Sequence, residues 1–289
     1  MTIFVTGGSG LLGKKFIETT KDNYEIILTH NSNPTDGTVK CDITNEKEVL
    51  DVISKIEPEC IMHCAAMTNV DLCEDEQELA YKINGDGTKN LAKASEELGC
   101  KIVYVSTDFV FDGKKENYKE TDPINPQGIY AKSKYQGEQE LQKYSTNYAI
   151  ARVSVLYGWN NKPNFTTWVI NELRNNNQIN IVTDQYNSPT LADNAAEAML
   201  EIYKQDKTGI FHTAGNDNIS RYDFTQKIAE VFKLDTSLIN PVTSNQFKQK
   251  APRPQNSSLS VEKVKKELGI TMETCVESLE RMKKQEENF

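Results

Sequence analysis

The segment TIFVTGGSGLLG, residues 2–13, runs from β-branched and aromatic residues through a glycine-rich turn into the apolar start of a helix. Three of its glycines, Gly7, Gly10 and Gly13, have the spacing Gly-x-x-Gly-x-x-Gly. At a strand-to-helix junction, such glycines permit a tight turn, close approach of the backbone to a pyrophosphate, and close packing of the helix on its strand. The free amides at the helix N-terminus suit phosphate groups. The segment therefore predicts a nucleotide-binding turn.

Apolar and amphipathic runs alternate after this turn. Strands are expected at Ile3–Thr6, Glu25–Thr29, Cys60–Cys64, Lys101–Ser106 and Tyr148–Val153, and helices at Leu11–Thr20, Glu46–Lys55, Gln77–Leu98 and Tyr130–Tyr144. Near-continuous apolar strands between amphipathic helices are typical of a parallel sheet covered on both faces. The predicted fold class is α/β, a Rossmann-like doubly wound parallel sheet with a smaller C-terminal substrate-binding lobe.

The second half of the chain has a looser rhythm. A strand-like run at Ile179–Thr183, a helical run at Ala192–Lys204 and a strand-like run at Gly209–Thr213 follow a stretch rich in Asn and Gln. We expect a dinucleotide-binding domain over residues 1–153, which the chain re-enters around residues 179–213. Residues 154–178 and 214–289 are expected to form the substrate-binding lobe.

The composition excludes several classes of protein. The 289 residues carry 33 basic and 42 acidic side chains, a formal net charge of −9, which disfavours nucleic-acid binding. No apolar run reaches the roughly 18 residues of a membrane span, and no secretory signal precedes the first strand. The six cysteines lack Cys-x-x-Cys spacing, and the three histidines lack ligand spacing, so no metal site is predicted. We expect reduced cysteines and a cytoplasmic protein with no membrane partner.

The end of the second expected strand bears on the choice of cofactor. An acidic residue that binds the ribose of NAD is expected about 20 residues beyond the glycine turn. His30, Asn31 and Ser32 stand there instead. The missing carboxylate removes a repulsion against a 2′-phosphate, so NADPH is the predicted cofactor, with NADH as the weaker option.

Tyr130 and Lys134 are four residues apart on an expected helix, which places both side chains on one face. An ammonium beside a phenol favours the phenolate and lowers the tyrosine pKa from about 10. Such a tyrosine can protonate a ketone oxygen as hydride reaches the carbon. The strand before this helix ends in Ser106, Thr107 and Asp108, and ligands bind at the carboxyl ends of such strands. A hydroxyl there either bonds a substrate carbonyl or only caps the strand.

Together these motifs resemble the extended short-chain dehydrogenase/reductases, and within them the dTDP-4-dehydrorhamnose reductase family. The resemblance covers nearly the whole chain, and its more specific segments are CAAMTNVD at 64–71, STDFVF at 106–111, DQYNSPT at 184–190 and RPQNSSL at 253–259. It implies NADPH-dependent reduction of the 4-keto group of dTDP-4-dehydro-6-deoxy-L-mannose, which gives dTDP-L-rhamnose.

The resemblance also implies roles for individual residues. Tyr130 would donate the proton, Lys134 would hold the nicotinamide ribose and tune Tyr130, and Thr107 would orient the carbonyl. The implied cofactor positions, besides Tyr130 and Lys134, are Gly7, Gly10, Leu11, Leu12, Gly13, His30, Asn31, Ser32, Asp42, Ile43, Ala65, Ala66 and Asn84. The implied positions for the nucleotide-sugar substrate are Met67, Thr68, Asp108, Phe109, Tyr157 and Arg253.

The chain departs from the family pattern in two places. Val155 stands where the family often has an aromatic residue, which leaves the identity of the sugar open. Some members are described as dimerising through Mg²⁺ and acidic residues, but Val182 and Thr183 precede Asp184 where such an acid would be expected. A metal role is therefore not predicted, and a homodimer stays open.

The motifs leave three functions of the protein open. The same branch includes the regulatory beta subunit of methionine adenosyltransferase, which binds NADP and serves as a partner protein. The chain is then either a reductase or an NADP-binding regulatory subunit of that kind. A reductase of another nucleotide-linked 4-keto-6-deoxy sugar is the further possibility.

In the lobe, Phe165 and Trp168 either pack together or stack on a pyrimidine base.

Overall fold

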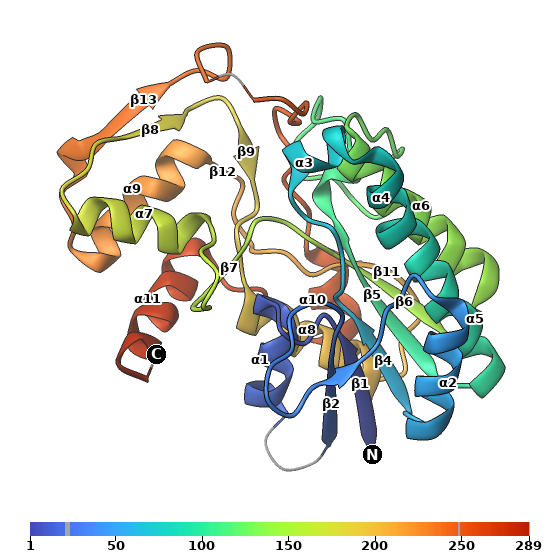
Figure 1. Ribbon diagram of the computed structural model, residues 1–289. Coiled ribbons are helices and arrows are strands. Elements are labelled where there is room, and N and C mark those ends of the chain that lie inside the picture. The colour runs from blue at the N-terminus through green and yellow to red at the C-terminus, as the bar shows by residue number, and fades with distance from the viewer. Residues whose placement is uncertain (21–23, 248, 289) are drawn as a thin grey trace.

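The computed structural model describes residues 1–20, 24–247 and 249–288. Among these residues, the main sheet has seven parallel strands in the order β11-β6-β5-β4-β1-β2-β3 (Figure 1). The strands are β1 Thr2–Thr6, β2 Glu25–His30, β3 Val39–Lys40, β4 Cys60–His63, β5 Lys101–Thr107, β6 Tyr148–Val153 and β11 Gly209–His212. The order 3-2-1-4-5-6 is that of the doubly wound dinucleotide-binding sheet. The expected fold class is confirmed.

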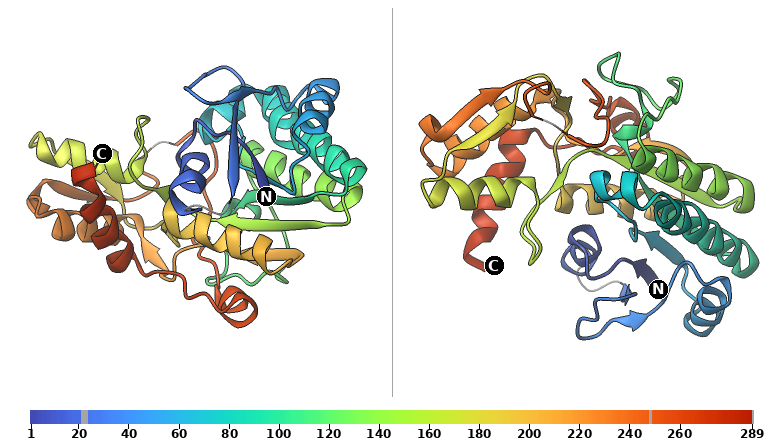
Figure 2. Two further views of the ribbon diagram at one scale, coloured as in Figure 1. Left: turned by 90° about the horizontal axis from the view of Figure 1, so that it is seen from below. Right: turned by 45° about the horizontal axis from the view of Figure 1, so that its top comes forward.

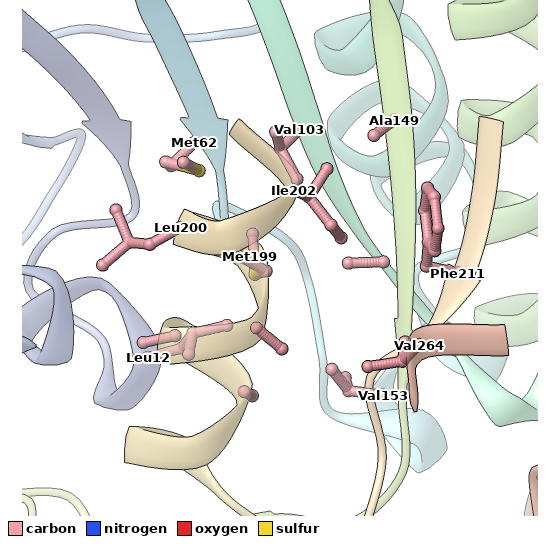
Figure 3. Close-up of a cluster of buried hydrophobic side chains, with 14 of the residues drawn as sticks. Leu12, Met62, Val103, Ala149, Val153, Met199, Leu200, Ile202, Phe211 and Val264 are labelled. Atoms are coloured by element: carbon pink, nitrogen blue, oxygen red, sulfur yellow. The ribbon is translucent and has the colours of Figure 1, made fainter. Parts of the chain in front are cut away.

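Helices cover both faces of this sheet (Figure 1). One face is packed by α2 Glu46–Ile56, α5 Gly87–Leu98 and α6 Ile129–Tyr144, and the other by α1 Leu11–Thr19, α8 Ala192–Lys204 and α10 Glu262–Leu268. Because successive strand residues point to opposite faces, Phe4 and Ile102 enter the first layer while Ile3 and Val103 enter the second. Figure 3 shows the second layer, where apolar side chains of α8 lie between those of β4, β5 and α1.

Local sequence fixes where several helices begin. The side chain of Asn45 accepts a hydrogen bond from Glu48 N at the start of α2, and Ser220 does the same for Asp223 N at the start of α9, Arg221–Phe232. A reciprocal capping box of Thr274 and Glu277 begins α11, Cys275–Gln285. Helix α1 differs because it begins at Gly10, which has no capping side chain.

The single helix expected over Gln77–Leu98 is divided into three parts. These are α4 Gln77–Tyr81, a π-helical turn over Lys82–Asp86, and α5. Helix α3 Val70–Asp75 precedes them. The π turn carries Asn84, whose side chain bonds the backbone of Met67 in the segment between β4 and α3. Such turns occur often next to functional sites.

The remaining elements form a smaller lobe beside the carboxyl ends of the strands (Figures 1 and 2). It contains α7 Phe165–Arg174, α9 Arg221–Phe232, α11 Cys275–Gln285, β8 Ile179–Val182 and β13 Ile239–Val242. Two separate two-stranded sheets lie in the segments through which the chain passes between the main sheet and the lobe. They pair β7 Leu156–Tyr157 with β10 Thr190–Leu191 and β9 Tyr186–Asn187 with β12 Ile219–Ser220. Short 3-10 turns occur at Asp108–Val110, Thr236–Leu238 and Glu286–Asn288.

The chain re-enters the main sheet later than expected. Strand β8 pairs in parallel with β13 of the lobe, so the segment from residue 179 belongs to the lobe. Ile179 and Ile181 are buried there against Phe224 and Ile239. The return to the main sheet is made by α8 and β11. Within the described parts of the chain, no helix is long and apolar enough to cross a membrane.

A candidate dinucleotide and substrate cleft

A cleft of about 660 Å³ lies at the carboxyl ends of the strands. Its walls come from the glycine turn, the ends of β2, β4 and β5, the first turns of α6, and Arg221 of the lobe. A second cavity of about 340 Å³ adjoins it and shares Val70, Phe109 and Arg221 with it. The cleft therefore continues from the sheet into the lobe, at the position where doubly wound sheets bind ligands.

Close packing explains the glycines of the turn. Gly7 has a φ of +68°, and a Cβ there would lie 2.8 Å from the backbone nitrogen of Ala65. A Cβ on Gly13 would lie 2.5 Å from the carbonyl oxygen of Gly7. No side chain caps α1 at Gly10, and its first turn has no acidic residue. The N-terminus of α1 thus faces the cleft with amides that suit an anion.

The far end of the cleft contains the residues expected after the second strand. His30, Asn31 and Ser32 line it, and the His30 ring is held through Nδ1 by Thr38 Oγ1 at 2.8 Å. Asp42 also lines it, but its Oδ1 already accepts hydrogen bonds from the Thr44 amide and hydroxyl, each at 2.9 Å. The lining residues from 29 to 33 carry no acidic side chain.

The three residues expected to be catalytic meet in the middle of the cleft. Thr107, Tyr130 and Lys134 all line it. Thr107 Oγ1 accepts from Phe109 N at 3.2 Å, and Thr107 also forms a hydrogen bond with Tyr130. Lys134 is 2% exposed, and its Nζ donates to the Val105 carbonyl oxygen at 2.7 Å.

The charge states of this group differ from the expectation in one respect. Burial raises the pKa of Tyr130, the hydrogen bond with Thr107 opposes this, and the nearby Asp108 raises it further. Lys134 is not among the groups that act on Tyr130, so the expected lowering of the tyrosine pKa by this lysine is wrong for this structure. Burial lowers the pKa of Lys134 to about 7. Tyr130 therefore keeps its proton at neutral pH, as a proton donor requires.

Asp108 connects the cleft to the lobe. Its buried carboxylate accepts hydrogen bonds from Ser154 Oγ at 2.9 Å, from Thr107 Oγ1 at 3.2 Å and from Ser257 Oγ. Burial raises its pKa, and these hydroxyls lower it. Phe109, the next residue, packs edge-on against the Tyr130 ring, with centroids 6.0 Å apart. The hydrogen bonds of Asp108 and the ring contact of Phe109 thus fix the segment at the end of β5.

Most other expected residues line the cleft. These are Gly7, Gly10, Leu11, Leu12, Gly13, Ile43, Ala65, Ala66, Thr68, Asp108 and Phe109. Arg253 lines the second cavity instead, where its guanidinium pairs with Asp71 at 3.0 Å.

Three expected contact residues lie outside both cavities. Asn84 is buried behind the wall, where its side chain bonds Met67 N at 2.8 Å and Met67 O at 3.1 Å. Neither Asn84 nor Met67 lines the cleft, so the pair shapes the wall from behind. Tyr157 is fully buried in the lobe core, with its ring 5.3 Å from that of Phe224. Its side chain packs in the lobe core and borders neither cavity.

Arg221 is the main lining residue that the sequence did not indicate. It borders both cavities, and its guanidinium lies 4.7 Å from the centroid of the Phe165 ring. Burial lowers its pKa to about 10, which still leaves it charged at neutral pH. Within the described residues, its side chain forms no ion pair with a carboxylate. A lone arginine at the start of α9 carries no local sequence signal.

Val155 also lines the cleft, with an unusual backbone. Its φ of +43° lies in the left-handed region, which is costly for a β-branched residue. Its carbonyl oxygen accepts a hydrogen bond from Thr190 N at 3.2 Å. The strained position holds an aliphatic side chain against the ligand space at the point where the chain passes from sheet to lobe.

The fold and the cleft define a Rossmann-type protein of the extended short-chain dehydrogenase/reductase class. More particularly, the chain belongs to the family of the RmlD substrate binding domain, whose model matches residues 1–288. This agrees with the family expected from the sequence motifs.

Individual relatives cover nearly the whole chain. The dTDP-4-dehydrorhamnose reductase of Aggregatibacter actinomycetemcomitans is 33% identical, with 93% of each chain covered. The methionine adenosyltransferase 2 subunit beta of Danio rerio is 32% identical, covering 94% of this chain and 86% of its own. The crystal structure of dTDP-4-dehydrorhamnose reductase from Bacillus anthracis in complex with NADP is 33% identical, with a TM-score of 0.91 over 98% of this chain and 99% of its own.

Proposed function

We propose that this chain is an NADPH-dependent reductase of the 4-keto group of dTDP-4-dehydro-6-deoxy-L-mannose, with dTDP-L-rhamnose as product. The observation that carries the proposal is the meeting of Thr107, Tyr130 and Lys134 in a cleft that runs from a glycine turn to a second cavity. The named relatives that are dTDP-4-dehydrorhamnose reductases support the substrate. We also propose that the sheet domain holds the cofactor and the lobe holds the nucleotide sugar.

The cleft fits a dinucleotide cofactor. A Cβ at Gly7 or Gly13 would collide with the backbone of Ala65 or of Gly7, so these glycines allow the tight turn before the uncapped N-terminus of α1, which would receive the pyrophosphate. At the other end of the cleft, the lining residues from Thr29 to Asn33 after β2 carry no carboxylate that would repel a 2′-phosphate. Ala65 and Ala66 would contact the cofactor between these ends, and Lys134 would hold the nicotinamide ribose.

The residues of the chain would carry out the proton chemistry. Bound NADPH would supply the hydride to C4 of the sugar. Tyr130, which keeps its proton at neutral pH, would transfer it to the carbonyl oxygen. The hydrogen bond between Thr107 and Tyr130 would keep the two hydroxyls together at the carbonyl oxygen. Lys134, one helical turn further along α6, would hold the nicotinamide ribose beside Tyr130.

The second cavity would bind the nucleotide part of the substrate. Arg221 lies where the two cavities join, and its planar guanidinium suits a diphosphate. Beyond it, Phe165 and Trp168 line the cavity with their rings 6.0 Å apart, and the Trp168 side chain is 39% exposed. An exposed aromatic face of this kind can stack on a pyrimidine base.

Arg221→Met tests the place of the diphosphate. Among the described residues, no carboxylate forms a salt bridge with the guanidinium, although the charge of Asp108 acts on it. Its loss should therefore raise KM for the nucleotide sugar about tenfold or more, as expected for a charge-assisted hydrogen bond. The Kd for NADPH should be unchanged. Arg174→Met, which removes an exposed arginine paired with Glu286, is the control and should change neither value. An equal loss of cofactor and substrate affinity would contradict the assignment.

Asn31→Asp tests the basis of cofactor choice. The new carboxylate would stand at the end of β2 in the cleft wall, where it would repel a 2′-phosphate and bind a ribose hydroxyl. KM for NADPH should rise about tenfold relative to that for NADH, since one charge interaction of about 1.4 kcal/mol corresponds to that factor. Asn147→Asp adds the same charge outside the cleft lining and should leave the ratio unchanged. An unaltered ratio in Asn31→Asp would place the 2′-phosphate elsewhere.

Two other functions have specific support. The 32% identity to a methionine adenosyltransferase subunit beta favours a cofactor-binding regulatory subunit, and the aliphatic Val155 in the cleft favours a different 4-keto-6-deoxy sugar. A panel of nucleotide-linked 4-keto-6-deoxy sugars, with product analysis, separates the first proposal from the last. Tight NADPH binding with no turnover on the panel, together with co-purification of a methionine adenosyltransferase, would favour the regulatory subunit.

A further inference from the structure

A third polar residue, Glu138, lies on the same face of α6 as Tyr130 and Lys134. Glu138 lies one further helical turn along the same face and is 1% exposed. Its Oε1 accepts from Ser106 Oγ at 2.5 Å and from Arg152 Nε at 2.9 Å, and its Oε2 accepts from Arg152 Nη2 at 2.7 Å. Ser106 and Arg152 are partners in the register of β5 and β6. Glu138 therefore ties the catalytic helix to the carboxyl ends of two strands.

Arg152 is itself fixed on its other side. Its Nη1 lies 3.4 Å from Nε2 of His212 on β11, and because a guanidinium only donates, Nε2 must accept. The His212 proton is then on Nδ1, which lies 3.2 Å from the Ser260 carbonyl oxygen. Burial and Arg152 lower the pKa of His212 to about 3, so the imidazole stays neutral. With Arg152 held in this way, the Glu138 carboxylate is fixed against the ends of β5 and β6.

This arrangement bears directly on Lys134. Its ammonium donates to the carbonyl of Val105, the residue before Ser106, so one strand end binds both side chains. A nearby buried carboxylate offsets part of the cost of removing a lysine charge from water. Glu138 acts on Lys134 in this direction, against the effect of burial.

The other titratable groups that face Lys134 are neutral at pH 7. Burial raises the pKa of Cys64 at the end of β4 to about 12, and that of Tyr104 on β5 lies well above its usual value. Burial and Lys134 hold the pKa of His63 well below 6.5, and Tyr130 keeps its proton. Among the described groups that act on Lys134, Glu138 is the carboxylate.

We propose that Glu138, held by Arg152 and Ser106, is a positioning residue that keeps the Lys134 ammonium charged and in place beneath the cleft. The pair of Glu138 and Arg152 then does more than stabilise the fold, because its carboxylate sets the charge of Lys134, the residue that would hold the nicotinamide ribose beside Tyr130. The part of the proposal that concerns catalysis rests on the proposed reductase function, whereas the part that concerns the charge of Lys134 does not.

The direct test is an NMR titration of protein carrying [ε-¹³C]lysine, with the Lys134 resonance assigned by its loss in Lys134→Arg. In Glu138→Gln, the midpoint of the Lys134 titration should fall by about 1 pH unit or more, the effect of a close opposite charge. A folded Glu138→Gln protein with an unchanged midpoint would overturn the proposal. Asp206→Asn removes the carboxylate partner of another buried lysine, Lys101, and should leave the Lys134 midpoint where it was.

Activity provides the second readout. The alkaline limb of the kcat/KM profile should move to lower pH in Glu138→Gln by the same amount as the midpoint, whereas a purely structural loss would lower the rate equally at all pH values. If the substrate proves to be wrong, the NMR titration still decides the role of Glu138. If Glu138→Gln does not fold, the double variant Glu138→Gln, Arg152→Gln leaves no unpaired buried charge at this pair. Since Arg152 is not among the groups that act on Lys134, the midpoint should fall there too.

Discussion

Tyr130→Phe is expected to lower turnover by about 10²–10⁴-fold, the usual contribution of a positioned general acid. The phenol lines the cleft, keeps its proton at neutral pH and forms a hydrogen bond with Thr107. Removing its oxygen leaves the glycine turn, the N-terminus of α1 and Lys134 unchanged. The Kd for NADPH should therefore stay the same, which a fluorescence titration measures beside the steady-state rate.

The matched control for this variant lies on the same helix. Tyr144→Phe removes a phenol oxygen at the last residue of α6, outside the lining of the cleft. It should leave both turnover and cofactor binding at the level of the unmodified protein. Full turnover in Tyr130→Phe would exclude the phenol as proton donor. Loss of NADPH binding together with turnover would mean that Tyr130 holds the cofactor and has no separable chemical role.

Gly7→Ala should weaken NADPH binding by about tenfold or more and lower the free energy of unfolding. Two costs combine at this position: a left-handed residue with a Cβ costs about 1–2 kcal/mol, and the new Cβ would meet the backbone of Ala65 at 2.8 Å. Because the contact is with backbone, either the turn or the end of β4 must move. Both form the cofactor cradle. Urea unfolding and a fluorescence titration with NADPH measure the two effects.

Gly99→Ala separates the two costs. Gly99 ends α5 with a φ of +67°, almost the value at Gly7, but a Cβ there meets no atom within 4 Å. It should show only the conformational cost, with NADPH affinity unchanged. Equal stability losses in the two variants, with cofactor binding intact in both, would show that the close approach at Ala65 does not hold the turn in its binding geometry.

Local signals in the sequence account for the parts of the fold that were predicted well. The run from Ile3 to Gly13 combines an apolar strand, a turn that only glycine fits, and a helix start, all within one βα unit. The spacing of Tyr130 and Lys134 on a helix and the position of Thr107 at a strand end are equally local. Since strands of a parallel sheet end at one edge, these local features were enough to bring the three side chains together.

The remaining features depend on contacts between distant segments. Whether the strand at Ile179–Val182 pairs with the main sheet or with β13 is decided by which apolar core it covers, and nothing in its own residues determines that. Arg221 reaches the cleft because the lobe folds back over the strand ends. Tyr157, expected at the substrate, is drawn into the lobe core beside Phe224.

The spacing of residues in the sequence also does not predict the charge states of Tyr130 and Lys134. Four-residue spacing places Lys134 near Tyr130, but the direction of the tyrosine pKa follows from burial, which the spacing does not reveal. Likewise, the residue that acts on Lys134 is one turn further along, at Glu138, and is held there by an arginine from another strand. The depth of each group in the folded protein decides which charged form it takes.

The central claim is tested most directly by mixing the purified protein with NADPH and enzymatically generated dTDP-4-dehydrorhamnose and following the decay of nicotinamide fluorescence. The account predicts rapid oxidation of NADPH, with dTDP-L-rhamnose formed in equal amount and a slower reaction with NADH. Tight binding of NADPH without oxidation, under conditions where a known reductase consumes the same substrate, would contradict it.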